Sequence, residues 1–186
     1  MNYIVTGPIC SGKSTLLETA KGFGFNIIKS DDVVSNLYND KVIISKLMGI
    51  FNECKFETSP KEKIKDLFFQ SHSNRIKIEN IFHPKVHEII ENELKFNNNV
   101  LIELPPIRSN ISFIKNNKSI FIDANLEMRR ERFRERNTMD SVETFHMMNE
   151  YQTDCLLMKT YCYIIIQNNQ KTSMMTDYFN KDIIKS

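Results

Sequence analysis

One segment within the first 15 residues of this 186-residue chain restricts its fold more than any other. Residues 7–14 read G-P-I-C-S-G-K-S and fit the pattern G-x-x-x-x-G-K-[ST]. An apolar run precedes them, and Leu16, Leu17 and Ala20 follow with helical spacing. A strand, a glycine-containing loop and a helix in this order direct backbone N–H groups and the positive helix end at phosphate oxygens. The pattern therefore predicts a phosphate-binding loop, or P-loop, and nucleotide binding.

Each position of this loop has an expected task. The backbone N–H groups hold phosphate oxygens, while Lys13 reaches the β- and γ-phosphates. Ser14 offers its hydroxyl to Mg²⁺, and Thr15 contacts an α-phosphate oxygen of ATP. The alternative is a coincidental match, expected at ordinary residue frequencies in roughly one chain in a hundred or fewer. The predicted nucleotide-binding residues of the loop are Gly7, Ile9, Cys10, Ser11, Gly12, Lys13, Ser14 and Thr15.

Short apolar runs alternate with helical patterns along the rest of the chain. This alternation predicts an α/β fold, with a parallel sheet covered by helices on both faces. One domain is expected, because 186 residues with 41% apolar side chains can bury a single sizeable core. The expected strands are 2–5, 26–28, 100–104, 120–122 and 161–166, the last three of them buried. The first expected helices are 13–21 and one that Ser30 or Asp31 caps. Most of 42–95 is expected to be helical, with breaks at Pro60 and at His83-Pro84. The last expected helices are one that Asp123 or Asn125 caps and that ends at Arg136, and 172–184.

Composition excludes several classes of protein. A net charge of +2 and a pI of about 8.3 are too mild to indicate binding to nucleic acid or to a membrane surface. The longest apolar runs fall far below the roughly 20 residues of a spanning helix. Four cysteines lack metal-ligand spacing, and residues 1–7 do not resemble a secretory signal. We therefore expect a cytoplasmic protein with free thiols.

Two acidic residues lie at or just after the ends of expected strands, where ligands collect in an open α/β sheet. Asp31 could accept the proton of an attacking hydroxyl group, or Asp31 or its neighbour Asp32 could merely cap a helix. Glu103 could serve Mg²⁺ or its waters, or could be an ordinary charged residue at a strand end.

Two clusters of polar residues have the spacing of helix faces. Arg132 and Arg136, four residues apart, could clamp phosphates or stack on adenine. The acidic residues between the arginines also allow a solvated helix with ion pairs, and they argue against nucleic-acid binding. Arg75, Glu79 and His83 share another face, which could line a substrate pocket or lie on the surface.

Several motifs together resemble the dephospho-CoA kinases, P-loop enzymes that phosphorylate the ribose 3′-hydroxyl of dephospho-CoA. Residues 7–15 are similar to the family's GGIxSGKST, and residues 24–31 to its G-x-x-x-I-D-A-D. Residues 79–84 resemble LExIxHP, and residues 103–107 resemble D-x-P-L-L. Residues 132–137 resemble R-L-x-x-R-D at the entry to a lid, and residues 166–169 resemble I-x-N beside the adenine.

This resemblance implies a P-loop kinase fold with a five-stranded parallel sheet, a helical substrate-binding region and a lid. The implied division is a core at about 1–40, 97–136 and 159–186, a helical region at about 41–96 and a lid at about 137–158. The implied activity is the ATP- and Mg²⁺-dependent last step of coenzyme A biosynthesis, in a monomer or weak homo-oligomer. The implied site residues are Asp31, Lys13 and Arg136 for catalysis, Arg132 and Asn168 for the nucleotide, Ser14 for the metal, and Arg75, Glu79, His83 and Pro105 for the acceptor.

The chain departs from the family pattern in the substrate and lid segments. Lys29, Ser109 and Gln170 replace an Asp, a Glu and a Gly, and Met147 with Met148 replaces an Arg-Ile pair. Two other interpretations stay open: a nucleoside or deoxynucleoside monophosphate kinase, and a nucleotide-binding regulatory module without turnover. Asp31 discriminates between the two kinases, because only a hydroxyl acceptor must lose a proton.

Overall fold

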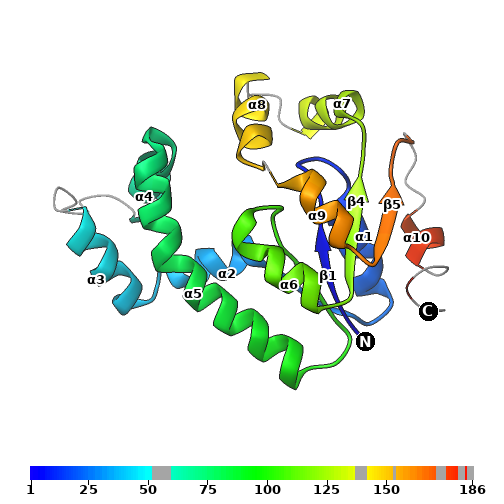
Figure 1. Ribbon diagram of the computed structural model, residues 1–186, viewed down its shortest axis with the longest axis horizontal. Coiled ribbons are helices and arrows are strands. Elements are labelled where there is room, and N and C mark those ends of the chain that lie inside the picture. The colour runs from blue at the N-terminus through cyan, green and yellow to red at the C-terminus, as the bar shows by residue number, and fades with distance from the viewer. Residues whose placement is uncertain (52–59, 137–141, 153, 171–174, 180–182, 184–186) are drawn as a thin grey trace. The chain divides into compact units, whose positions relative to one another are not determined.

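The computed structural model describes residues 1–51, 60–136, 142–152, 154–170, 175–179 and 183 (Figure 1). The chain packs into two compact units, Met1–Ile28 with Asn98–Ser186, and Lys29–Asn97. The predicted helical region 41–96 falls in the second unit, which also contains residues 29–40 of the predicted core. The finer division into core, helical region and lid stays a prediction.

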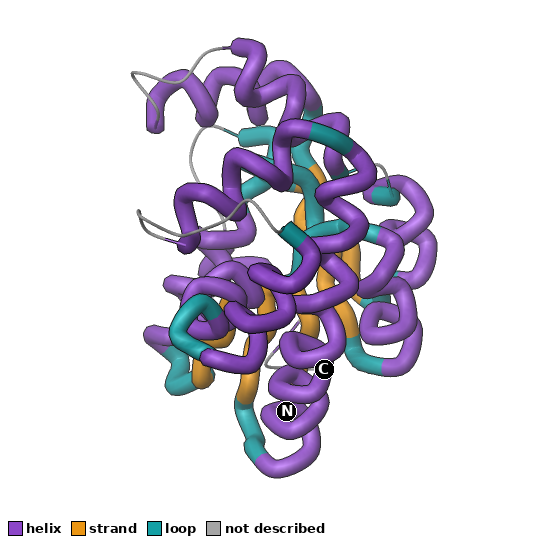
Figure 2. The backbone as a smooth tube through the Cα atoms, turned by 90° about the vertical axis from the view of Figure 1, so that its left-hand side faces the viewer, coloured by secondary structure: helices purple, strands orange, loops and turns teal. Residues whose placement is uncertain are grey.

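A five-stranded sheet carries the first unit. Its strands are β1 (Asn2–Thr6), β2 (Asn26–Lys29), β3 (Val100–Glu103), β4 (Ser119–Asp123) and β5 (Ile164–Gln167). They lie side by side in the order β2-β3-β1-β4-β5, and β1 pairs in parallel with both β3 and β4. The strands are drawn in orange in Figure 2. The predicted five-stranded parallel sheet and P-loop kinase fold are thus confirmed.

The central strands form because their side chains are apolar on both faces. Tyr3, Ile4 and Val5 are fully buried, as are Val100, Leu101 and Ile102 of the neighbouring strand, and this pattern is typical of a parallel sheet covered on both sides. The helix α1 (Lys13–Gly22) packs Leu16, Leu17 and Ala20 against this sheet in one apolar core. The sheet therefore fixes both the start and the end of the loop at residues 7–12.

Further helices of the first unit follow the strands. They are the 3₁₀ turn η1 (Arg108–Asn110) and the helices α6 (Ile111–Asn116), α7 (Leu126–Arg136), α8 (Val142–Tyr151), α9 (Cys155–Tyr161) and α10 (Met175–Tyr178). Asn125 caps α7, since its side-chain oxygen accepts a hydrogen bond of 2.8 Å from the Met128 N–H. Among the described helices, none has the length and apolar character needed to cross a membrane.

Two predictions at the end of the chain require changes. The strand expected at 161–166 is β5 at Ile164–Gln167, and Tyr161 is the last residue of α9. β5 is not a buried strand: it is an edge strand paired only with β4, so Ile166 is buried while Ile165 is exposed. Of the helix expected at 172–184, α10 is the described part, and residues 172–174, 180–182 and 184 lie outside the described residues.

The second unit is helical. It contains α2 (Ser30–Leu37), α3 (Lys41–Ile50), α4 (Pro60–Gln70) and α5 (His72–Phe96). The break expected at Pro84 is wrong, because α5 continues through this proline. Buried residues on both sides of it, including Phe82 and Val86, hold the helix against its neighbours despite the missing backbone N–H.

Candidate functional site

The two glycines of the P-loop occupy positions that other residues do not fit. Gly7 has φ 145°, and a Cβ atom there would collide with the Ile122 carbonyl oxygen of β4. Gly12 has φ 110°, and its Cβ atom would collide with the Asn168 side chain. β1 ends immediately before this loop and α1 begins immediately after it. The predicted strand, loop and helix are therefore present, with both glycines required by the backbone.

Lys13 lies across its own loop. Its Nζ donates hydrogen bonds to the carbonyl oxygens of Gly7 at 2.9 Å and Pro8 at 3.1 Å. The same Nζ lies 3.7 Å from Glu103 Oε1. Parallel pairing of β1 with β3 places Glu103 beside Val5, which brings this carboxylate to the loop. Glu103 therefore contacts the P-loop lysine, and Lys13 Nζ is held by two carbonyl oxygens and one carboxylate oxygen.

Arg132 and Asn168 hold the outer side of the loop. Arg132 Nη1 donates to the carbonyl oxygens of Cys10 at 3.4 Å and Ser11 at 3.2 Å, and its Nη2 donates to the Asn168 carbonyl at 2.9 Å. Asn168 Nδ2 also donates to the Ser11 carbonyl at 2.8 Å. Because the C=O and the following N–H of a planar trans peptide point in opposite directions, these bonds turn the Gly12 N–H away from Arg132.

Arg129 is a site residue that the sequence reasoning missed. Its side chain is buried on α7, and it donates to Ala124 O at 3.1 Å, to Asn149 Oδ1 at 2.6 Å and to Ile9 O at 3.5 Å. The signal was available in the sequence, because residues 129, 132 and 136 are spaced as one helix face.

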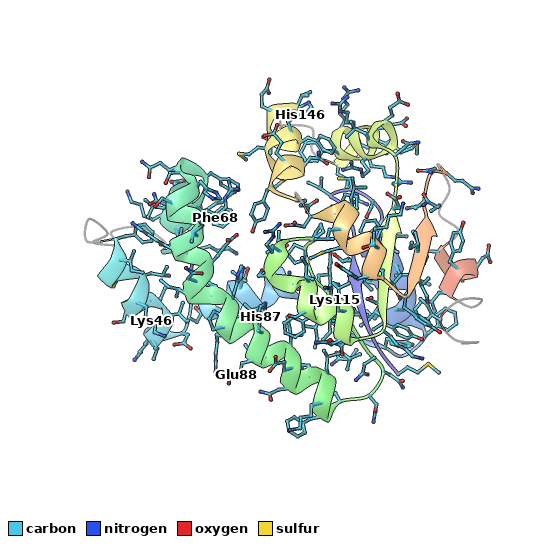
Figure 3. All side chains as sticks on the ribbon, in the orientation of Figure 1. Lys46, Phe68, His87, Glu88, Lys115 and His146 are labelled. Atoms are coloured by element: carbon cyan, nitrogen blue, oxygen red, sulfur yellow. The ribbon has the colours of Figure 1, made fainter. Side chains whose placement is uncertain are left out.

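The residues that follow α8 also reach the loop. Gln152 Oε1 accepts a hydrogen bond of 2.6 Å from the Ile9 N–H. This bond occupies a backbone donor that the sequence assigned to phosphate. α8 itself packs on α7 through the rings of Phe133 and Phe145, 5.3 Å apart, and through Arg130 and His146, whose Nη2 and Nε2 atoms are 3.3 Å apart (Figure 3).

Positive charge collects around the middle of the loop. Burial raises the pKa of the Cys10 thiol, while the charges of Arg136, Lys13, Arg129 and Arg132 oppose this rise. The exposed Arg136 thus acts electrostatically on the loop, although its side chain has no described contact there. Such a field favours an anionic ligand.

The hydroxyl groups of the loop differ in their surroundings. Ser11 is fully buried, and its Oγ has no hydrogen-bond partner among the described residues. Ser14 is exposed in the first turn of α1, and Thr15 is half-buried beside it. Ser14 therefore offers an accessible oxygen atom one residue after Lys13.

An acidic residue at the end of β4 has a partner that the sequence did not suggest. Asp123 Oδ2 accepts hydrogen bonds from Lys159 Nζ at 2.6 Å and from Gln167 Nε2 at 3.3 Å. Burial raises the pKa of Asp123, but the bond and charge of Lys159, with the Gln167 and Ala124 bonds, outweigh it and leave that pKa below its ordinary value. Asp123 is thus part of an ion pair and not the cap of α7.

The second unit holds Asp31. This residue is exposed in the first turn of α2, next to Asp32. Lys29 occupies the N-cap position and makes no capping bond through its side chain, so the helix is not capped by Ser30 or Asp31 as one interpretation predicted. A carboxylate in a first helical turn is nevertheless stabilised by the helix dipole.

The expected acceptor residues of α5 lie on one helix. His83 stacks on His87 with ring centroids 5.8 Å apart, and the Arg75 guanidinium lies 5.1 Å from the centre of the Phe68 ring (Figure 3). Burial lowers the pKa of His83, against the opposing charge of Glu79 and together with that of His87. The predicted common face of Arg75, Glu79 and His83 is therefore present in α5.

The fourth expected acceptor residue, Pro105, belongs to the first unit. Its carbonyl oxygen accepts hydrogen bonds of 2.9 Å from Asn110 Nδ2 and from the Ile107 N–H, which shape the loop after β3. Of the residues named at the departures, Gln170 accepts a bond of 3.0 Å from Arg132 through its carbonyl oxygen. Asn137, at the entry to the expected lid, lies outside the described residues.

Comparison with known proteins identifies the family of this chain. Residues 3–173 match the family described as "Dephospho-CoA kinase". The chain belongs to the dephospho-CoA kinase family. A dephospho-CoA kinase of Buchnera aphidicola is 28% identical over 106 residues, which cover 51% of this chain and 46% of that protein. A dephospho-CoA kinase of Legionella pneumophila (strain Paris) is 27% identical over 142 residues, which cover 72% of this chain and 69% of that protein. The match thus spans about half the length of the first relative.

Solved structures agree on the fold. A protein of Thermus thermophilus superposes with a TM-score of 0.74 at 21% identity, covering 95% of this chain and 91% of that one. A dephospho-CoA kinase from Campylobacter jejuni superposes with a TM-score of 0.66 at 22% identity, covering 95% of this chain and 92% of that one. A shikimate kinase from Bacteroides thetaiotaomicron superposes with a TM-score of 0.58 at 15% identity, covering 95% of this chain and 92% of that one. Kinases with different names share this fold, so the fold alone does not identify the acceptor.

The geometry of Gly12 leads to a first prediction. Gly12→Ala forces a side chain into a left-handed backbone region and against Asn168, so we expect a loss of about 1–3 kcal/mol in unfolding free energy and at least ~10-fold weaker ATP binding. Gly22→Ala, at the end of α1 where a Cβ meets no atom, is the matched control and should not destabilise the protein. Urea unfolding and calorimetric titration measure both effects. Equal behaviour of the two variants would contradict this account of the loop.

The Asp123–Lys159 pair leads to a second prediction. Because the pKa of Asp123 is lowered in the folded state, its stabilising effect is present above about pH 5 and is lost as the pH falls below about 4. The difference in unfolding free energy between wild type and Asp123→Asn should be largest near neutral pH, at most ~1 kcal/mol for so exposed a pair, and shrink on acidification. Urea unfolding at several pH values tests this, with the exposed Asp177→Asn as control. A difference in unfolding free energy that grows on acidification would contradict the lowered pKa of Asp123.

Proposed function

We propose that this protein transfers the γ-phosphate of ATP to the ribose 3′-hydroxyl of dephospho-CoA, giving coenzyme A and ADP. The observation that carries the proposal is the P-loop itself, with Lys13 bound across the cradle and three arginines around it. The family match over residues 3–173 supports the choice of acceptor. The kinase family also supports ATP as the phosphoryl donor.

The loop suits a triphosphate because its donors and its charge converge. Lys13 leaves the Gly7 and Pro8 carbonyls to follow the β- and γ-phosphates, while the N–H groups of Cys10 and Gly12 stay directed away from the arginines that hold the preceding carbonyls. Arg132 and Arg136 add positive charge on the α7 side. Asn168 keeps the loop and the expected adenine-binding segment together.

Mg²⁺ fits the oxygen atoms present. Ser14 offers an exposed hydroxyl, and Glu103 offers a carboxylate beside Lys13. The described residues contain no group of three acidic, histidine or cysteine side chains that could hold a metal alone, and Mg²⁺ with a nucleotide needs only one or two protein oxygens besides the phosphates. When bound, the ion would neutralise developing charge on the transferred phosphoryl group.

For the acceptor we assign the proton-accepting role to Asp31. Its carboxylate is exposed and matches the second Asp of the family's G-x-x-x-I-D-A-D. Arg75, Glu79 and His83 on α5, with Pro105 after β3, are the residues proposed to bind dephospho-CoA. The free thiols of Cys10, Cys155 and Cys162 agree with a reducing cytoplasm, and we propose a monomer or weak homo-oligomer there.

Asp31 and Asp32 form a matched pair for the third prediction. Both are exposed in the same helical turn, but only Asp31 is assigned a chemical role. Asp31→Asn should lower kcat on dephospho-CoA by about 10²–10⁴, the usual contribution of general base catalysis, with little change in ATP affinity or melting temperature. Asp32→Asn should keep kcat within about two-fold. Equal kcat for wild type and Asp31→Asn would contradict the assignment of Asp31 as the general base.

The acceptor is tested with the wild-type protein. ADP release is measured with dephospho-CoA and with a panel of nucleoside and deoxynucleoside monophosphates. We expect turnover with dephospho-CoA alone. Turnover only with monophosphates would replace this function by a nucleotide kinase, and ATP binding without turnover on any acceptor would indicate a regulatory module.

A further inference from the structure

Arg129 is a buried cation beside the P-loop, with 9% of its surface exposed. None of the carboxylates among the described residues forms an ion pair with it. Its hydrogen-bond partners are the neutral oxygen atoms of Ala124, Asn149 and Ile9. A buried guanidinium without an anionic partner is costly, so its place next to an anion-binding loop needs an explanation.

Neutral partners compensate this charge only in part. Burial lowers the pKa of Arg129, and the opposing influence of Cys155, Asp123 and Cys10 does not restore it. The Phe145 ring centroid lies 5.9 Å from the guanidinium carbon, and this cation–π contact offsets only part of the cost because the ring carries no net charge. An anion brought to the loop would therefore relieve a cost that the fold already bears.

The contact with Ile9 also has a direction. Arg129 binds the Ile9 carbonyl, so the Cys10 N–H in the same planar peptide points to the opposite side. Gln152 holds the Ile9 N–H from the region after α8. Arg129 thus contributes to the orientation of a loop donor and adds positive charge behind it.

We propose that Arg129 is a positioning residue of the nucleotide site, whose unpaired charge is completed by the β- and γ-phosphates of the bound nucleotide. The residue acts through the Ile9–Cys10 peptide and through its charge, and needs no direct contact with the substrate. This inference rests on the proposed function only in requiring a nucleoside triphosphate as ligand, not on the identity of the acceptor.

The test is a comparison of AMP, ADP and ATP affinities by calorimetric titration. Arg129→Gln should weaken ATP binding about 10-fold or more, ADP binding less and AMP binding little, because the loss follows the number of phosphates. Arg134→Gln, an exposed arginine on the same helix, should change each Kd less than two-fold. Arg129→Lys keeps the charge but not the hydrogen bonds of the guanidinium to Ala124, Ile9 and Asn149, so it should recover only part of the ATP affinity.

An equal loss for the three nucleotides would reduce Arg129 to a structural residue and overturn the proposal, as would unchanged ATP binding. These titrations need no acceptor, so a protein that binds ATP as expected but does not phosphorylate dephospho-CoA contradicts only the proposed function. The two failures are therefore distinguishable.

A second variant keeps the test valid if Arg129→Gln does not fold. Asn149→Asp retains an acceptor at 2.6 Å from Arg129 and supplies the missing carboxylate. We expect a stable protein whose ATP affinity falls more than its AMP affinity, because an internal anion now neutralises the guanidinium. Unchanged or tighter ATP binding would contradict the proposal. Where Arg129→Gln folds, adding Asn149→Asp to it should weaken ATP binding less than Asn149→Asp weakens it in the wild type, because no guanidinium is left to neutralise. Direct repulsion between the new carboxylate and the phosphates would instead weaken ATP binding equally in the wild type and in Arg129→Gln, and would contradict the proposal.

Discussion

The phosphate-binding loop depends on the way its own carbonyl oxygens are held. Those of Ile9, Cys10 and Ser11 accept hydrogen bonds from Arg129, Arg132 and Asn168. The planar peptides therefore turn the N–H groups of Cys10 and Gly12 the other way, as an anion requires, while the Ser11 N–H donates to the Pro8 carbonyl at 3.2 Å. β1 and β4 fix the start of the loop, α7 supplies both arginines, and the segment after β5 supplies the amide. The sheet order that brings these elements together thereby creates the site.

Local patterns made much of this molecule predictable. The P-loop spacing identified its strand, loop and helix, and continuous apolar runs identified the buried strands β3 and β4. Side-chain partners far apart in sequence were not predictable, because no local pattern links Arg129 to Asn149 or Asp123 to Lys159. Pro84 misled for a related reason: tertiary packing of α5 outweighed the local rule for proline. The roles assigned to Asp31 and Arg136 stay predictions.

The departures from the family pattern have different surroundings. Gln170 stands where the family has a glycine, yet it contributes through its carbonyl oxygen, an atom that every residue has. Met147 and Met148 lie exposed on α8, where the contacts with α7 come instead from Phe145, His146 and Asn149. Lys29 marks the end of β2 and the start of the second unit. The hydrogen bond from Arg132 to position 170 thus does not depend on which side chain is present there.

The most direct test of the central claim is to identify the product. The protein is incubated with ATP, Mg²⁺ and dephospho-CoA, and the product is examined by mass spectrometry and ³¹P NMR. The account predicts ADP together with a phosphomonoester on the ribose 3′-hydroxyl of the acceptor, absent when Lys13→Ala replaces the wild type. Recovery of unmodified dephospho-CoA from a protein that binds ATP, or phosphate at another position, would contradict it.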